Sequence, residues 1–144
     1  MNRVPEYSTN VEWLGGHRGV LRCGNGAEVP FSAPEALHGE QGVLTPEDAF
    51  VGALNTCYTL MFIWAAEKLN IDLVSYRCET TGYVEEHLDR TSTFSRMTIR
   101  PSIVVRGTTE DRVNRALRMA EKYSLIWQSV KAQVSLEPHV TVAA

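Results

Sequence analysis

The longest uninterrupted hydrophobic segment of the chain lies near its centre. Residues 49–66 contain no charged side chain, and apolar residues occupy nearly every face of a helix drawn through them. Thr45 is a suitable N-cap, Pro46 suits the first helical position, and two acidic residues follow at the positive end of the helix dipole. The pattern predicts a helix that begins at Pro46 and ends near Leu69.

A helix without a polar face has to be covered on every side. Its length reaches the lower limit for a membrane span, but the polar residues Asn55, Thr56 and Thr59 lie inside it and amphipathic segments flank it. We therefore expect a helix buried in protein, with one side covered by a second copy of the chain. The prediction is an obligate homodimer without a membrane span.

Shorter periodic segments surround this helix. Two glycines around Asn25 are a hairpin signal between early strands, and alternation later in the chain predicts a long second hairpin. After the second hairpin, i, i+3, i+4 spacing predicts an amphipathic helix that starts near Thr108 or Thr109, then a short helical turn. The strands are expected at residues 11–13, 18–22, 28–31, 73–88, 95–105 and 132–142, the last interrupted by Pro138. This order predicts a single α+β domain over residues 1–144.

Charge and polarity narrow the possible functions. The formal net charge is -3 and the 14 basic residues are dispersed, which argues against a nucleic-acid partner. Arg96, Arg100 and Arg106 recur at even intervals along one strand and predict a solvated face. The polar N-terminal segment lacks the pattern of an export signal, so we expect a cytoplasmic protein.

The cysteines and histidines show no ligand pattern. Cys23, Cys57 and Cys78 are far apart in the sequence, and the four histidines lack metal-ligand spacing. We therefore expect no disulfide framework, no metal and no cofactor. Free thiols are typical of a reducing compartment, which again favours the cytoplasm.

Cys57 lies in the middle of the predicted apolar helix, and two interpretations are open. A buried free cysteine commonly packs as a small hydrophobic residue. A reactive thiol would need a cation from another element, because the helix dipole acts only over the first turn. Glu47 precedes Cys57 by ten residues, roughly 15 Å along the same helix at ~1.5 Å per residue. In a two-fold dimer, however, the helix start of one chain can lie over the helix middle of the other.

Several of these residues together resemble a known family. The spacing Trp13-x-x-Gly16-x-x-Gly19, followed by Pro46-Glu47 and a mid-helix Cys57, is similar to the OsmC/Ohr family of osmotically inducible and organic hydroperoxide resistance proteins. The C-terminal EKYSLIWQSVKAQVSLEP also resembles that family's second helix and final strand. The resemblance covers residues 11–142. It implies an intertwined homodimer in which curved antiparallel sheets wrap around two central helices.

The resemblance also implies a peroxide-reducing site at the subunit interface. Cys57 would attack the O–O bond of an organic hydroperoxide or of hydrogen peroxide. An arginine would hold the thiolate and polarise the peroxide, and Glu47 would orient that arginine. Arg18 is the best match to this arginine, with Arg22 as the alternative.

One position departs from the family pattern. The family's second, resolving cysteine should lie near the end of the second helix, where this chain has Ser124. A serine cannot condense with a sulfenic acid to form a disulfide. We therefore expect a peroxidase that works in a one-cysteine mode with an external thiol as reductant. The alternative is a catalytically degenerate OsmC-fold dimer that binds a small apolar or thiol ligand in its interface cleft. We expect Cys78 and Cys23 to have packing roles, and whether either can resolve Cys57 is open.

Overall fold

The computed structural model describes residues 4–144. Residues 1–3, the start of the polar N-terminal segment considered above for an export signal, lie outside the described residues. The chain divides into two compact units, the first ending at Phe50 and the second beginning at Val51. Each is described by itself.

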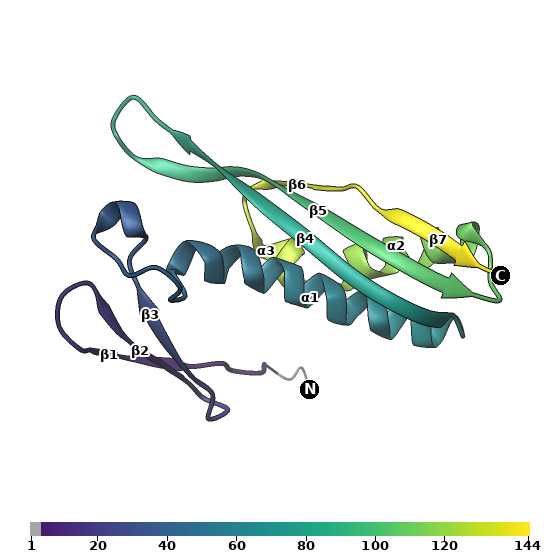
Figure 1. Cartoon of the computed structure of the whole chain (residues 1–144), viewed down its shortest axis with the longest axis horizontal. Helices are drawn as coiled ribbons and strands as arrows, with labels where there is room; N and C mark the ends of the chain where they lie inside the picture. Colours follow the sequence, from purple (N-terminus) through teal and green to yellow (C-terminus); the bar gives the residue numbers. More distant parts are fainter. Residues whose placement is uncertain (1–3) are drawn as a thin grey trace. The chain divides into compact units, whose positions relative to one another are not determined.

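The first unit is built on a three-stranded antiparallel sheet in the order β1-β2-β3 (Figure 1). The strands are β1 (Thr9–Trp13), β2 (Arg18–Cys23) and β3 (Glu28–Ser32), each within two residues of its predicted bounds. The hairpin between β2 and β3 turns through Gly26, whose φ of 97° favours glycine. A short 3-10 helix, η1 (Glu35–Leu37), lies in the loop that follows β3.

The long apolar segment forms α1 (Pro46–Lys68), which starts in the first unit and continues into the second. Its N-terminus is capped as predicted: the Thr45 hydroxyl accepts the backbone N–H of Asp48 at 3.0 Å and donates to the Asp48 carboxylate at 2.8 Å. Beyond the C-terminus, Asn70 adopts a left-handed conformation with φ 54°, which asparagine tolerates. The predicted bounds of this helix are therefore confirmed to within a residue.

A four-stranded sheet forms one layer of the second unit (Figure 1). It contains β4 (Asp72–Glu86), β5 (Ser92–Arg106), β6 (Gln133–Leu136) and β7 (His139–Ala143). Strand β5 is antiparallel to β4 on one side and parallel to β6 and then β7 on the other. On β5, Pro101 falls where β6 has ended and β7 has not begun.

The helices of the second unit pack on one face of this sheet (Figure 1). They are the continuing α1, α2 (Glu110–Tyr123) and the short α3 (Leu125–Ser129). The apolar positions predicted for α2 are all buried, and they meet buried residues of α1 and β5. This core includes Leu54, Tyr58, Phe62, Met97, Ile99, Ile103, Val105, Val113, Ala116, Leu117 and Ala120.

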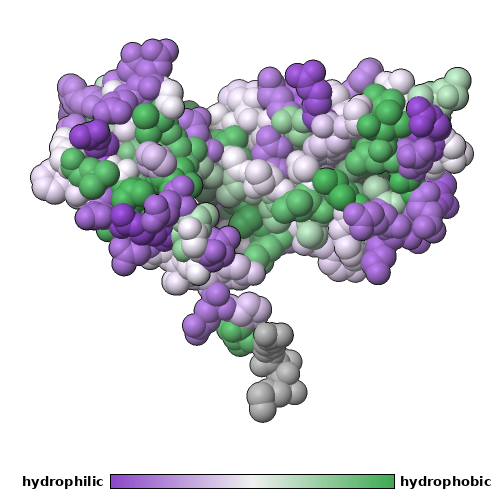
Figure 2. All heavy atoms as spheres, turned by 60° about the horizontal axis from the view of Figure 1, so that its bottom comes forward, coloured by the Kyte–Doolittle hydropathy of each residue, from purple (hydrophilic) through white to green (hydrophobic). Residues whose placement is uncertain are grey.

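Part of α1 is exposed. Only 28% of its most apolar 18-residue window is buried, and by length and composition alone the helix could also cross a membrane. Leu60 on this helix is 61% exposed. Figure 2 shows hydrophobic atoms open to solvent on the face of the molecule that carries α1. The buried residues of this helix, Leu54, Tyr58, Phe62, Ala65 and Ala66, therefore share one side of it.

Candidate active site around Cys57

Cys57 lies midway along α1, at the border between its buried and uncovered faces. The neighbouring Leu54, Tyr58 and Phe62 are completely buried, whereas Cys57 is only partly buried. A residue with a fully enclosed thiol would serve packing alone. Cys57 is not enclosed in this way, because part of its surface is exposed.

Ser124 lies against the sulfur of Cys57. Its hydroxyl donates a hydrogen bond to Cys57 Sγ at 3.3 Å, and its side chain is completely buried. Ser124 follows the last residue of α2 and is the N-cap of α3, where it accepts the backbone N–H of Trp127 at 3.3 Å. The structure thus brings Ser124, predicted to stand in place of a resolving cysteine, directly beside Cys57.

Aromatic residues adjoin this pair: Tyr58 follows Cys57 in the sequence, and Trp127 donates its backbone N–H to Ser124. The Tyr58 ring lies 5.7 Å from the Trp127 ring, and Trp64 meets Tyr123 edge-on at 5.4 Å. The Tyr58 hydroxyl donates to the backbone carbonyl of Leu117 at 3.1 Å. Burial is the main reason that the pKa of Tyr58 is raised well above its ordinary value of 10.0. Tyr58 therefore acts as a neutral, packed neighbour and not as an acid at ordinary pH.

Cys78 lies against a different flank of α1. The side-chain amide of Asn55 donates to the backbone carbonyl of Cys78 at 3.1 Å, and Thr59 donates to the Tyr76 hydroxyl at 3.1 Å. An α-helix turns by about 100° per residue, so Asn55 and Cys57 point in nearly opposite directions. Cys78 is therefore separated from Cys57 by the body of the helix, and it is not positioned to resolve it.

The environment of Cys78 also differs from that of Cys57. Burial raises the pKa of the Cys78 thiol, although hydrogen bonds from neighbouring hydroxyls oppose the shift. The thiol lines a mostly apolar hollow of about 440 Å³ between α1 and β4, together with Asn55, Thr59, Leu60 and Tyr76. A raised thiol pKa reduces the thiolate fraction, which is the nucleophilic form. Cys78 is thus the less reactive type of cysteine.

The two candidate arginines, both in the first unit, have different surroundings. Arg22 is held by Glu12 and Glu28 across the sheet, each at 3.0 Å, and these hydrogen bonds raise its pKa. Arg18 makes one long ion pair of 3.9 Å with Glu40, and both side chains are 57% exposed. Arg22 is therefore engaged in a cross-strand cluster, whereas Arg18 has donor groups left for another partner.

The first unit contains two hollows, a polar hollow that Arg18 borders and an apolar hollow. The polar hollow, of about 380 Å³, includes His17, His38 and Glu40. Glu47 is exposed in the first turn of α1, and within this unit Arg18 pairs with Glu40. The apolar hollow, of about 430 Å³, is lined by Val11, Leu21, Phe31, Leu44, Thr45, Pro46, Ala49 and Phe50.

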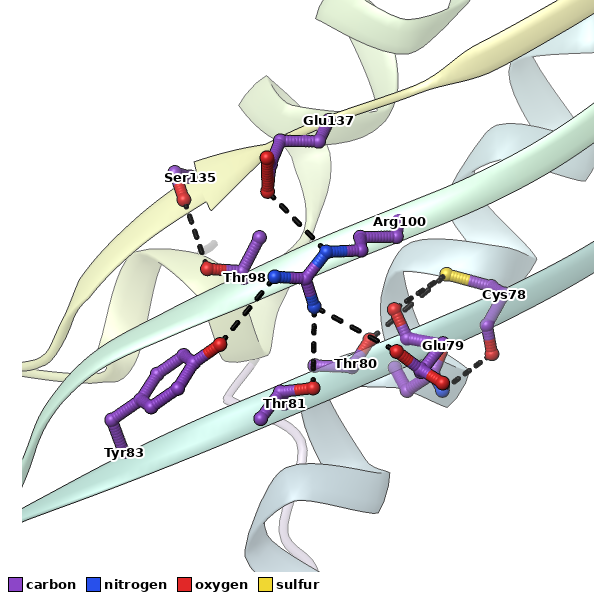
Figure 3. A network of polar contacts seen from close by, with 10 residues as sticks. Cys78, Glu79, Thr80, Thr81, Tyr83, Thr98, Arg100, Ser135 and Glu137 are labelled. Carbon is purple, nitrogen blue, oxygen red and sulfur yellow. Dashed lines mark hydrogen bonds and ion pairs between the residues drawn. The ribbon is translucent and has the colours of Figure 1, made fainter.

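A separate polar cluster lies on the outer face of the second sheet (Figure 3). Arg100 contacts Glu137 at 3.4 Å, Glu79 at 3.8 Å and the hydroxyls of Thr81 and Tyr83. The hydrogen bond from Arg100 lowers the pKa of Tyr83. Buried residues of β5 are mainly odd-numbered, so its even-numbered arginines face away from the helices and from Cys57. The predicted solvated face is confirmed, with Arg100 itself half-buried.

The sequence contains a signal for the position of Ser124 as a helix N-cap. A serine directly before a short helical turn is a typical N-cap, which fixes its side chain. The spatial neighbour of that cap could not be read from the same signal, because it depends on how α1 packs against the junction of α2 and α3. The contact between Ser124 and Cys57 is therefore a finding of the structure.

The fold and the site define an α+β protein with a partly buried cysteine on a long apolar helix. Residues 39–139 match the family model described as OsmC-like protein. The chain therefore belongs to the OsmC-like protein family, and the family predicted from its sequence is confirmed. No curated protein sequence matches the chain.

Solved structures give the same fold at low sequence identity. An OsmC-like protein of unknown function from Vibrio cholerae is 22% identical, with a TM-score of 0.84 over 94% of this chain and 99% of that one. An organic hydroperoxide resistance protein from Elizabethkingia anophelis is 13% identical, with a TM-score of 0.73 over 99% and 100%. An organic hydroperoxide resistance protein OsmC from Legionella pneumophila is 14% identical, with a TM-score of 0.71 over 97% and 99%. The predicted OsmC-like fold is thus confirmed.

Proposed function

We propose that this protein is a cytoplasmic, thiol-dependent reductase of organic hydroperoxides that acts in oxidative-stress defence through a single cysteine. The observation that carries the proposal is the 3.3 Å contact between Cys57 Sγ and Ser124 Oγ. It supports the correspondence between Ser124 and the resolving position, since a cysteine placed there would lie beside Cys57. The names of two structural neighbours, both organic hydroperoxide resistance proteins, agree with this reaction.

The reaction would proceed in three balanced steps. The Cys57 thiolate attacks one peroxide oxygen, an S–O bond forms as the O–O bond breaks, and the alkoxide leaves as an alcohol after taking a proton. Sulfur is oxidised to the sulfenic acid and the hydroperoxide is reduced. An external thiol then attacks that sulfur and releases water, and a second thiol frees Cys57 as the external disulfide leaves.

The remaining catalytic roles are assigned to Arg18 and Glu47. A guanidinium near the sulfur would stabilise the thiolate and the charge that develops on the leaving oxygen. Arg18 suits this role better than Arg22, whose donors are already engaged by Glu12 and Glu28. Glu47 of one subunit would orient the arginine near Cys57 of the other.

A homodimer is part of the proposal. The uncovered apolar face of α1, with Leu60 61% exposed, supports a second copy as its cover. Leu60→Asp would place a charge on this face and should convert the dimer to a monomer, while Leu88→Asp, on the exposed tip of the β4–β5 hairpin, serves as control. Sedimentation at low micromolar concentration measures both. A stable, folded wild-type monomer would contradict the dimer.

Peroxide consumption tests the reaction directly. Reduced protein is mixed with cumene hydroperoxide and an external thiol, and sulfenic acid is trapped and located by mass spectrometry. We expect modification at Cys57, loss of consumption in Cys57→Ser and in Arg18→Ala, and near wild-type consumption in Arg22→Ala. Equal consumption by Cys57→Ser would remove the proposal.

A binding role without turnover is the second candidate. It is favoured by the apolar hollow of about 430 Å³ in the first unit, which is large enough for a small apolar ligand. Native mass spectrometry of the purified protein would then detect a bound small molecule. Ligand-free protein that consumes peroxide would exclude this alternative.

A further inference from the structure

Ser124 has the direction of its hydrogen bonds fixed by its neighbours. A backbone amide can only donate, so the serine oxygen must act as acceptor for the N–H of Trp127. The hydroxyl has a single hydrogen, and the structure directs it to Cys57 Sγ at 3.3 Å. The sulfur is thus met by a donor whose own position is held by the start of α3.

Burial strengthens this arrangement. Ser124 has no exposed surface, so water does not compete for its hydroxyl. The residue also joins the end of α2 to the start of α3, which restricts its backbone on both sides. Cys57, in contrast, is partly exposed. A fixed donor thus contacts the sulfur of a residue that is not fully enclosed.

We propose that Ser124 is a positioning residue that donates a hydrogen bond to the Cys57 thiolate. The inference deepens the proposed peroxidase function and its second part rests on that function. Attack on a hydroperoxide gives the sulfenic acid and an alcohol, as written above, and loss of the sulfenic proton leaves the sulfenate. The sulfenate oxygen is then the stronger acceptor, and the Ser124 hydroxyl transfers its hydrogen bond to it.

A serine at position 124 leaves the oxidised Cys57 in a different state from the one that a cysteine there would produce. Its oxygen forms no disulfide, so the oxidised sulfur stays as sulfenate until an external thiol arrives. A hydrogen bond to the sulfenate oxygen withdraws electron density from the sulfur and slows its attack on a second peroxide. Ser124 thereby protects the single-oxygen stage from further oxidation to sulfinic acid.

The competing explanation is that Ser124 only caps α3. Two substitutions separate the roles, because alanine removes both the cap and the donor, whereas glycine removes the donor but is itself an acceptable N-cap. If only the cap matters, reactivity will follow thermal stability, and Ser124→Ala will be more impaired than Ser124→Gly. If the donor matters, both variants will lose reactivity to the same extent.

The experiment has an arm that is independent of peroxide. The rate of alkylation of Cys57 by iodoacetamide at neutral pH is measured by mass spectrometry in the wild type and both variants. We expect about a tenfold decrease in both, the effect of losing one hydrogen bond to a charged group. Alkylation of Cys78, on the other flank of α1, should be unchanged and serves as an internal control. Rates at Cys57 that stay within about twofold of the wild type, or that follow melting temperature, overturn the proposal.

A second arm uses cumene hydroperoxide and measures the fraction of Cys57 that carries two oxygen atoms. We expect this sulfinic fraction to increase in both variants relative to the wild type. An unchanged fraction overturns the protective role. Wild-type protein that consumes no peroxide while the alkylation difference persists would reject the peroxidase function and support Ser124 as the donor, so the two failures are distinguishable.

Discussion

The contact between Cys57 and Ser124 makes a disulfide at these positions an accessible test of the site. In Ser124→Cys the two sulfur atoms would start close together, because the native Sγ and Oγ are 3.3 Å apart. A small side-chain adjustment would bring them to the bonding distance of about 2.05 Å. We expect stoichiometric cumene hydroperoxide to convert this variant to a form in which Cys57 is bonded to the cysteine introduced at position 124, through the sulfenic acid at Cys57.

The expected stabilisation follows from the length of the loop that the bond would close. The two positions are 67 residues apart. Chain-entropy reasoning gives about 4 kcal/mol for a loop of this size, before any strain is subtracted. For a domain of this length that corresponds to an increase in Tm on the order of 10 °C, reversed by dithiothreitol.

Mass spectrometry and thermal denaturation measure the two expected effects. The intact mass of oxidised Ser124→Cys should fall by two hydrogens, and the peptides that contain positions 57 and 124 should be linked. The same variant with Cys57→Ser is the control and should do neither. Diamide in place of the peroxide tests the geometry without the peroxidase reaction. Absence of the linked peptides under both oxidants would refute the placement of Ser124 beside Cys57.

Three further predictions concern stability. Gly82→Ala should destabilise the fold by roughly 1–3 kcal/mol, because the added Cβ would lie 2.8 Å from the Phe94 ring. Denaturant titration measures this against the control Gly52→Ala, whose added Cβ meets nothing within 4 Å. Equal unfolding midpoints for the two variants would contradict the prediction. Burial raises the pKa of Tyr58 above 10.0, so the stability that its neutral side chain gives the folded state is complete below that pH and declines as the pH rises further. Tm measured between about pH 9 and about pH 11 should therefore fall less in Tyr58→Phe than in the wild type. Parallel slopes for the two proteins would count against this. Arg112 donates a hydrogen bond to the backbone carbonyl of Leu69, the residue that follows α1. Arg112→Ala should therefore lower the free energy of unfolding by about 1 kcal/mol. Urea denaturation measures this change, and an unchanged midpoint would show that the contact contributes nothing.

The elements could be predicted because their signals are local. Thr45 caps α1 through its own near neighbours in sequence, and Asn70 ends the helix through its backbone conformation. The spacing of α2 likewise fixed which of its positions are buried. Turn residues set the first hairpins in the same way. Each of these features depends on residues a few positions apart.

The chemistry of the site depended on packing and register, which the sequence does not contain. The sequence alone offered both Arg18 and Arg22 as the arginine of the site. The register of β1, β2 and β3 places Glu12 and Glu28 beside Arg22 and so distinguishes the two. Cys78 stayed a possible resolving thiol until the contact with Asn55 assigned it to another flank of α1. Only the packed structure separates these alternatives.

Tryptophan residues near Ser124 and Tyr58 provide an intrinsic fluorescence signal from this part of the protein. Trp127 provides the amide that Ser124 accepts, and its ring lies beside Tyr58, while Trp64 meets Tyr123. Trp13, by contrast, is 73% exposed and contributes a solvent-like emission background. We therefore expect the tryptophan fluorescence of unlabelled protein to change when Cys57 is oxidised.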